Sequence, residues 1–543
     1  MNYDVVIVGG GFAGMYALHR FRKQGLSVKV LEAGSDVGGT WYWNRYPGAR
    51  CDVPSLEYSY GFSEELEQEW DWPEIYSAQT DILRYANHVA DKFDLRRDMQ
   101  FNTKVISIDY QSEQNLWQLR TEKGEQFSGQ FCVMATGCLS VPNKPQLPGG
   151  DEFKGQVLHT GLWPKEPVDL TDKRVGIIGT GSSGVQAIPE LAKQAAHLTV
   201  FQRTPVYTVA ADPSPMREAV QQEFRDNYRQ IREMQQKSFG GISGFRPVSS
   251  VENKKQKKPP ETPIPVNILE MTEAERRTLV AERGLGVLLG FRDAYKDLVA
   301  NEAANEAFRS GIHNIVDDPD VATSLSPKTH GLGCKRQVFD RDYYATYNRS
   351  DVTLVDLSED PLLSIVESGV ETQSGCHELD VLIYATGFDA MTGALLRAGI
   401  NGKDGQSLND KWRYGPVAYL GLQMQGFPNL FTVTGPGSPS VLCNMLVAIE
   451  HHVNWIGDCI DYLKSKNLAS IEATDSAEQS WIAEVNQVAI GTMFTAPTCN
   501  SWYLGANIEG KPRIFMPYIG GFPRYRETCE RIVANDYEGF EFG

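Results

Sequence analysis

A glycine-rich turn between a short apolar strand and an amphipathic helix constrains this chain more than any other feature, because it occurs twice. In the first copy an apolar stretch at 4–8 leads into Gly9, Gly11 and Gly14, which have the spacing G-x-G-x-x-G. A helical pattern and a second apolar stretch at 28–31 follow. This order predicts a β-α-β unit of a parallel sheet.

The second copy repeats this order much later in the chain. An apolar stretch at 174–178 precedes it and another at 198–201 ends it. Its turn and the start of its helix contain Gly179, Gly181, Ser182, Ser183 and Gly184. Two such units so far apart indicate two separate folding units. We therefore expect an α/β fold with two Rossmann-like dinucleotide-binding domains and a helical insertion.

The first glycine turn has the features of a dinucleotide site. Its glycines allow a tight turn, a close approach of the backbone to a pyrophosphate, and packing of helix against strand. The helix N-terminus then faces the phosphates. Glu32 ends the second strand, where a carboxylate accepts hydrogen bonds from ribose hydroxyls. We assign FAD to this turn.

The second turn differs at the end of its second strand, which reads Gln202-Arg203-Thr204 and has no acid. An acid there would repel a 2′-phosphate, whereas Arg203 and Thr204 can bind one. The sequence therefore favours NADPH over NADH at this turn. Two such sites together imply electron transfer from nicotinamide to flavin.

Charge and hydropathy exclude several classes of partner. The chain has 543 residues and a net charge of -17, which argues against nucleic acid. No apolar run is long enough to span a membrane, and the first residues look like a strand rather than a signal peptide. We expect a cytoplasmic protein.

The nine cysteines are scattered and include no C-x-x-C pair, so we expect them to be reduced. Disulfide reductases carry a reactive C-x₄-C pair just after the first β-α-β unit. Cys51 has no partner at that spacing. The reduced flavin therefore needs an acceptor other than a protein disulfide.

The domain boundaries follow from the positions of the motifs. The FAD domain is expected at 1–140 and 387–543, and the NADP domain at 152–208 and 333–380. Between them, 209–332 changes to charged helical sequence and is expected to be a helical insertion.

Within this insertion we expect a helix at 216–237, a capping box from Thr272 to Glu275, and an exposed loop at 254–265. A long helix with one apolar face is expected from Asn444 onward.

Longer motifs lie around the two turns. Residues 153–163 fit F-x-G-x-x-x-H-x-x-x-W and end at Trp163, and Gly38-Gly-Thr-Trp41 is followed by Tyr46-Pro-Gly-Ala-Arg-Cys-Asp52. With these motifs the chain resembles the Baeyer–Villiger monooxygenases nearly end to end, least so in the helical insertion. Flavin-containing N- and S-oxygenases have a related pattern that normally ends in Phe or Tyr. The segments 435–445 and 501–507 resemble phenylacetone and steroid monooxygenases more than the cyclohexanone type.

The resemblance implies that NADPH reduces FAD and that O₂ then gives a flavin C4a-peroxide. This peroxide attacks a ketone, and the Criegee adduct rearranges to an ester or lactone. By resemblance Arg336 is the catalytic cation, Asp52 pairs with it, and Lys335 joins Arg203 and Thr204 at the 2′-phosphate. A guanidinium suits this role because it stabilises negative charge without losing its proton.

The resemblance also implies further cofactor contacts. Trp502 corresponds to a mobile-loop tryptophan that closes over NADP, and His159 lies in a linker where we expect a structural role. The remaining expected flavin contacts are Thr40, Trp41, Val105 and Met445.

Two alternatives stay open. One is a flavin-containing N- or S-oxygenase, and the other is an NADPH–flavin reductase without oxygenation.

Overall fold

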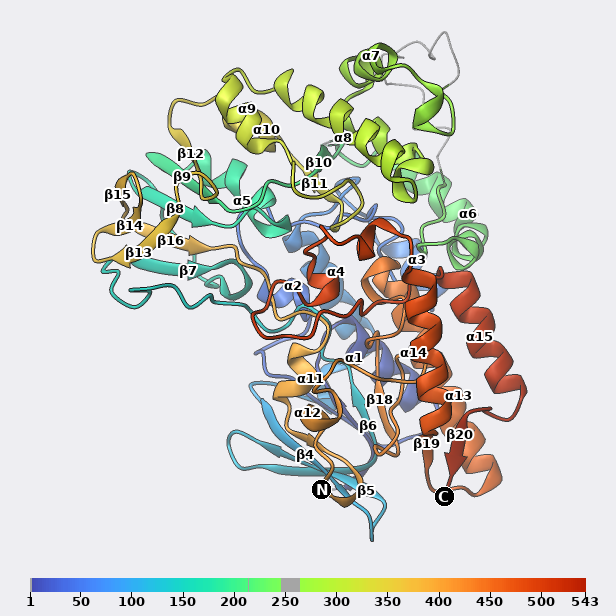
Figure 1. The fold of residues 1–543 in the computed structure, drawn as a ribbon. Helices are drawn as coiled ribbons and strands as arrows, with labels where there is room; N and C mark the ends of the chain where they lie inside the picture. The colour runs from blue at the N-terminus through green and yellow to red at the C-terminus, as the bar shows by residue number, and fades with distance from the viewer. Residues whose placement is uncertain (1, 213, 246–263) are drawn as a thin grey trace.

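The computed structural model describes residues 2–212, 214–245 and 264–543. Its architecture is α/β, built on two large sheets, which confirms the expected fold class. The second sheet lies on the left of Figure 1. Strands β4 and β5 of the first sheet lie at the bottom of the picture.

The first sheet has the order β17-β4-β5-β6-β1-β2-β3, with β18 paired to β6. Its centre is parallel because β1 pairs with both β2 and β6 in that sense, while β5 is antiparallel to both of its neighbours. The strands are β1 (Asn2–Val8), β2 (Val28–Leu31), β3 (Met99–Gln100), β4 (Val105–Gln111), β5 (Leu116–Thr121), β6 (Gln126–Met134), β17 (Ile400–Asn401) and β18 (Leu430–Thr432).

The second sheet has the order β12-β9-β8-β16-β7, and all of its pairs are parallel. Strand β16 lies between β8 and β7, just beyond the 333–380 range that we expected for this domain. The strands are β7 (Gln156–His159), β8 (Arg174–Ile178), β9 (His197–Gln202), β12 (Val352–Asp356) and β16 (Val381–Tyr384).

Each sheet carries the expected helix after its glycine turn. Helix α1 (Phe12–Lys23) follows β1, and α5 (Ser182–Ala192) follows β8. Helix α13 (Met445–Lys466) packs against α1 and buries an apolar face, as the spacing of its leucines and isoleucines predicted.

The glycines of both turns are needed for close backbone packing. A side chain on Gly14 would place its Cβ 1.8 Å from the carbonyl oxygen of Gly9, and one on Gly184 would lie 2.2 Å from that of Gly179. Any side chain at either position would therefore separate the helix from its strand.

The helices of the segment after β9 pack in two different places. Helix α6 (Glu218–Lys237) contacts α3 (Glu64–Glu69) and α15 (Phe522–Ala534). In contrast, α7 (Glu273–Arg283), α8 (Leu298–His313) and α9 (Pro319–Leu325) share a hydrophobic core with the second sheet. The predicted capping box of α7 is confirmed, with the Thr272 side chain and Glu275 each bonding the other's backbone. The loop expected at 254–265 lies almost entirely outside the described residues.

The remaining helices and strands complete the fold. The helices are α2 (Thr40–Trp43), α4 (Gln79–Lys92), α10 (Tyr343–Thr346), α11 (Gly393–Arg397), α12 (Leu408–Lys411) and α14 (Asp475–Ala489). The strands are β10 (Thr208–Ala210), β11 (Val338–Asp340), β13 (Leu362–Val366), β14 (Gly369–Thr372), β15 (Gly375–Glu378), β19 (Ile471–Ala473) and β20 (Phe540–Phe542). Within the described ranges, none of the helices is both long enough and apolar enough to cross a bilayer.

One expectation about the cysteines is wrong. Cys334 and Cys499 form a disulfide with a Cα–Cα distance of 5.5 Å, and the other seven cysteines are free. The two partners are 165 positions apart in the chain, so no local spacing motif indicates the pair.

Candidate functional site

The first glycine turn is closed by Glu32. Its carboxylate accepts hydrogen bonds from the backbone N–H groups of Gly10 at 2.5 Å and Gly34 at 2.6 Å, and the side chain is buried. Burial raises the pKa of Glu32, although the two N–H groups act to lower it. Glu32 therefore shapes the turn itself, in addition to its predicted role at a ribose.

The geometry of this turn fits a dinucleotide. No side chain caps the N-terminus of α1, so its first N–H groups are available to a pyrophosphate. Gly11 allows the turn to approach Gly39, since a Cβ on Gly11 would lie 3.2 Å from the Gly39 Cα. The next helix, α2, starts at Thr40, which is exposed at the same turn. These residues would hold the pyrophosphate of FAD.

The second glycine turn is built in the same way, but positively charged side chains lie near it. No side chain caps α5, and a Cβ on Gly181 would meet no atom within 4 Å. Thr180 donates a hydrogen bond to the Thr204 carbonyl at 2.9 Å, which ties the glycine turn to the end of β9. Arg203 is exposed at that strand end.

Lys335 joins this group of charges. Burial, together with the neighbouring charge of Arg203, lowers the pKa of Lys335 to about 8. Two cations close enough to repel each other provide a site for an anion. The structure therefore brings Arg203, Thr204 and Lys335 to one strand end, as a 2′-phosphate of NADPH would require.

Arg336 makes a bidentate contact with Asp52. Its Nε donates to one oxygen of Asp52 at 2.7 Å and its Nη2 to the other at 2.9 Å. Its Nη1 donates to the carbonyl of Val441 at 2.7 Å. Burial acts to lower the pKa of Arg336, but Asp52 and a hydrogen bond to Tyr503 outweigh it and hold the pKa above its ordinary value. The guanidinium is thus a fixed, permanent cation.

The other predicted residues are not all near Arg336. Met445 and Trp502 pack against the hydrophobic cluster that contains Cys334 and Tyr503. Trp41 is buried and donates a hydrogen bond to the Tyr58 hydroxyl at 3.1 Å. Val105 belongs to a different hydrophobic cluster, and its contact with flavin stays a prediction.

His159 joins two connecting segments. Its Nδ1 accepts a hydrogen bond from Gly161 N–H at 2.9 Å, and its Nε2 lies 3.3 Å from the Asn143 carbonyl. Burial lowers the pKa of His159. Both ring nitrogens have partners within the linkers, which agrees with a structural role for the ring.

Two contacts of Arg336 were missed from the sequence. Tyr503 follows Trp502 directly, and this neighbour of a predicted loop residue was a usable signal. The Val441 carbonyl gives no signal, because every residue has one.

The chain is similar to known proteins over nearly its whole length. Residues 6–258 match the family model described as pyridine nucleotide-disulphide oxidoreductase. A Baeyer–Villiger monooxygenase of Pseudooceanicola batsensis is 40% identical over 541 residues, covering 99% of this chain and 95% of the relative. The chain belongs to the Baeyer–Villiger monooxygenase family. The structure of an oxidised steroid monooxygenase bound to NADP superimposes with a TM-score of 0.90 at 46% identity, covering 100% of this chain and 99% of that one.

This family membership confirms the expected activity. The protein is an NADPH-dependent flavoprotein monooxygenase with FAD as its flavin. The disulphide oxidoreductase description refers to the shared nucleotide-binding fold, since Cys51 is buried and burial raises the pKa of its thiol. A phenazine N-monooxygenase of Lysobacter antibioticus also matches, at 38% identity, with 99% of this chain and 97% of that relative covered. The family therefore includes relatives named for other oxygenations.

Proposed function

We propose that this enzyme inserts one oxygen atom next to the carbonyl of a ketone, giving an ester or lactone, and that Arg336 is its catalytic cation. The observation that carries the proposal is the guanidinium held by both oxygens of Asp52 and by the Val441 carbonyl. Bound FAD, once reduced by NADPH, supplies the oxygen atom from O₂.

Arg336 suits this reaction because negative charge develops on oxygen during insertion. A positioned cation stabilises that charge most when it needs no rearrangement during the reaction. Three hydrogen bonds from two chain segments fix the plane of the guanidinium. Its raised pKa ensures that it does not act as a proton donor.

Asp52 serves as a positioning residue in this proposal. A bidentate carboxylate sets both the distance and the plane of a guanidinium, which a single contact cannot do. Asp52 also balances the positive charge of Arg336. Neither side chain is fully enclosed, since that of Asp52 is 22% exposed and that of Arg336 is 30% exposed. The pair therefore keeps one face of the cation available while fixing the other.

Replacing Arg336 tests the proposal. Arg336→Ala should lower ketone turnover by about 10²–10³, the usual loss for a donor aimed at developing charge. Flavin reduction by NADPH, followed by flavin absorbance, should change far less because it needs no such cation. Arg336→Lys should recover only part of the loss, since an ammonium cannot make the bidentate contact.

Arg349→Ala is the matched control, because Arg349 is an exposed arginine paired with Asp351 in the same way. It should leave turnover unchanged. Normal ketone oxidation by Arg336→Ala would overturn the assignment. Products from a panel of aryl, cyclic and long-chain ketones, identified by mass, would define the substrate class.

A second candidate is N-oxygenation, which the name of the Lysobacter antibioticus relative favours. An electrophilic oxygen transfer to nitrogen does not require a cation to stabilise an anionic oxidant. Arg336→Ala should therefore spare oxidation of a heteroaromatic amine while abolishing ketone oxidation. Equal loss of both activities would argue against this second function.

A further inference from the structure

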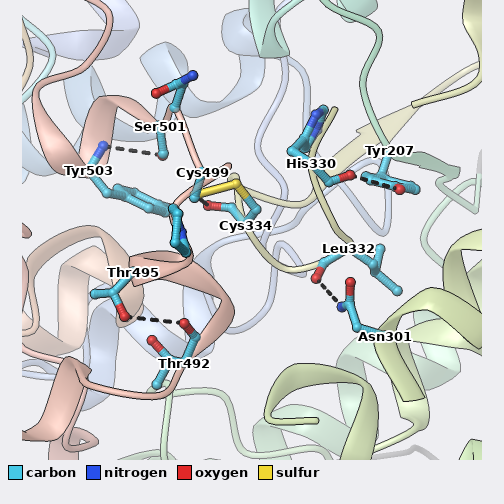
Figure 2. The surroundings of a disulfide bond; sticks show 12 residues. Tyr207, Asn301, His330, Leu332, Cys334, Thr492, Thr495, Cys499, Ser501 and Tyr503 are labelled. Carbon is cyan, nitrogen blue, oxygen red and sulfur yellow. Dashed lines mark hydrogen bonds between the residues drawn. A yellow bond between two sulfur atoms is a disulfide. The ribbon is translucent and has the colours of Figure 1, made fainter. Parts of the chain in front are cut away.

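The disulfide between Cys334 and Cys499 lies beside the proposed catalytic cation. Cys334 is two positions before Arg336, and Cys499 is four positions before Tyr503. Both cysteines are almost fully buried, at 1% and 0% exposure. Figure 2 shows the disulfide with Tyr503 on the segment that carries Cys499.

Tyr503 links this segment to Arg336. Its side chain is buried, and the hydrogen bond and charge of Arg336 act to lower its pKa, although burial raises it overall. The guanidinium has only N–H donors, so the Tyr503 oxygen accepts from it. The disulfide and this hydrogen bond therefore join the same two segments within a few residues of each other.

Several other contacts of the segment that carries Tyr503 connect it to parts of the chain away from Arg336. Lys511 pairs with Asp389 at 2.7 Å, and the backbone N–H of Met516 donates to the Tyr503 carbonyl at 2.9 Å. Arg513 donates to the Cys499 carbonyl at 2.6 Å, from within the same segment. These contacts order the segment but do not reach the Lys335–Arg336 stretch.

We propose that Cys334 and Cys499 form an oxidative cross-link whose closure positions Tyr503 on Arg336. This inference rests on the proposed role of Arg336. In its formation each thiol loses its hydrogen, and the pair gives two electrons to a peroxide oxidant. With hydrogen peroxide the products are one disulfide and two waters. The open form keeps a weaker tie, because Cys499 Sγ lies 2.9 Å from the Cys334 carbonyl and its thiol can donate there.

Thiol counting tests the cross-link itself. The peroxide-treated holoenzyme, unfolded without reductant and alkylated, should show seven modified cysteines, and nine after reduction. Peptide mapping should place the lost pair at 334 and 499. Nine modified cysteines after peroxide treatment, or a different pair, would overturn the proposal. This count does not depend on ketone oxidation, so it can succeed even where the assignment of Arg336 fails.

Kinetics test the positioning role. Reducing the cross-link, or replacing Cys499 by Ser, should lower ketone kcat by about tenfold, the value of one hydrogen bond to a charged group. Tyr503→Phe should cause a similar loss. In Tyr503→Phe, reduction should then cause little further loss, since both changes remove the same contact. Additive losses, or no loss on reduction, would overturn the positioning role.

Cys376→Ser is the control, because Cys376 is an exposed free cysteine. It should leave both the disulfide and turnover unchanged. If the cross-link were merely structural, reducing it would lower thermal stability without this dependence of turnover on Tyr503. Melting temperatures of the oxidised and reduced forms of Tyr503→Phe and Cys376→Ser are therefore measured together with the kinetics.

Discussion

We predict that Lys335 makes NADPH binding depend on pH. Its pKa is lowered to about 8 by burial, with a further contribution from Arg203. A bound 2′-phosphate would reverse this effect, because a dianion next to an ammonium favours the charged form. Binding at alkaline pH should therefore require Lys335 to take up a proton.

The size of the effect follows from the pKa of about 8. Free Lys335 is neutral in roughly one tenth of molecules at pH 7 and roughly nine tenths at pH 9. Proton uptake on binding should rise from about 0.1 to about 0.9 per site over this range. If only the charged form binds well, the Kd for NADP⁺ should rise about tenfold.

Isothermal titration calorimetry measures this uptake directly. NADP⁺ is titrated into the holoenzyme at pH 7 and pH 9, in pairs of buffers with different ionisation enthalpies. The Lys335→Arg variant is the control, because its guanidinium stays charged throughout. Equal uptake at both pH values, or unchanged pH dependence in the variant, would refute the reasoning.

Three further predictions follow from single contacts. Arg203→Ala should raise KM for NADPH by about tenfold and leave KM for NADH nearly unchanged, since a charge-assisted contact to the 2′-phosphate is lost; parallel shifts for both would contradict this. Gly14→Ala should yield protein with little bound flavin, measured by absorbance, because its Cβ would lie 1.8 Å from the Gly9 oxygen. Burial raises the pKa of Glu450 to about 7. Its folded form therefore binds more protons than the unfolded form between about pH 4.5 and 7, and stability falls as pH rises through that window. Glu450→Gln should flatten this fall, which is on the order of 2 kcal/mol, in denaturant melts at pH 5 and pH 8.

The sequence predicted the parts of the fold that local patterns specify. Strand β2 and strand β8 match their predicted limits, and α1 and α5 start directly after the expected glycines. These elements depend on short-range features: apolar runs, glycine spacing and helix starts. The pairing of Asp52 with Arg336 followed only from resemblance, because 284 positions separate them.

Other features required the three-dimensional arrangement. The disulfide joins two isolated cysteines, and the carbonyl of Val441 reaches Arg336 through a turn whose backbone path no residue type encodes. The helical segment also divides its packing: Arg232 of α6 forms a buried ion pair with Glu67 at 2.6 Å, while α8 packs under the second sheet. Amphipathic spacing predicts that a helix buries one face, but not which neighbour covers it.

The two glycine turns have the same backbone geometry but are predicted to bind different nucleotides. A Cβ on Gly9 would lie 2.4 Å from the Ala135 carbonyl oxygen, just after β6. A Cβ on Gly179 would lie 2.6 Å from that of Ala385, just after β16, so both turns pack closely on the segment that follows a neighbouring strand. The difference lies at the end of the following strand. At the first turn the buried Glu32 carboxylate accepts hydrogen bonds from two backbone N–H groups, at the strand end where we predict a ribose contact. At the second, Arg203 is exposed and repels Lys335, and this unfavourable pair becomes favourable only when an anion lies between its members. We therefore predict that selection of NADPH at the second site depends on a repulsion that the nucleotide relieves, and that removing either cation weakens the preference for the 2′-phosphate.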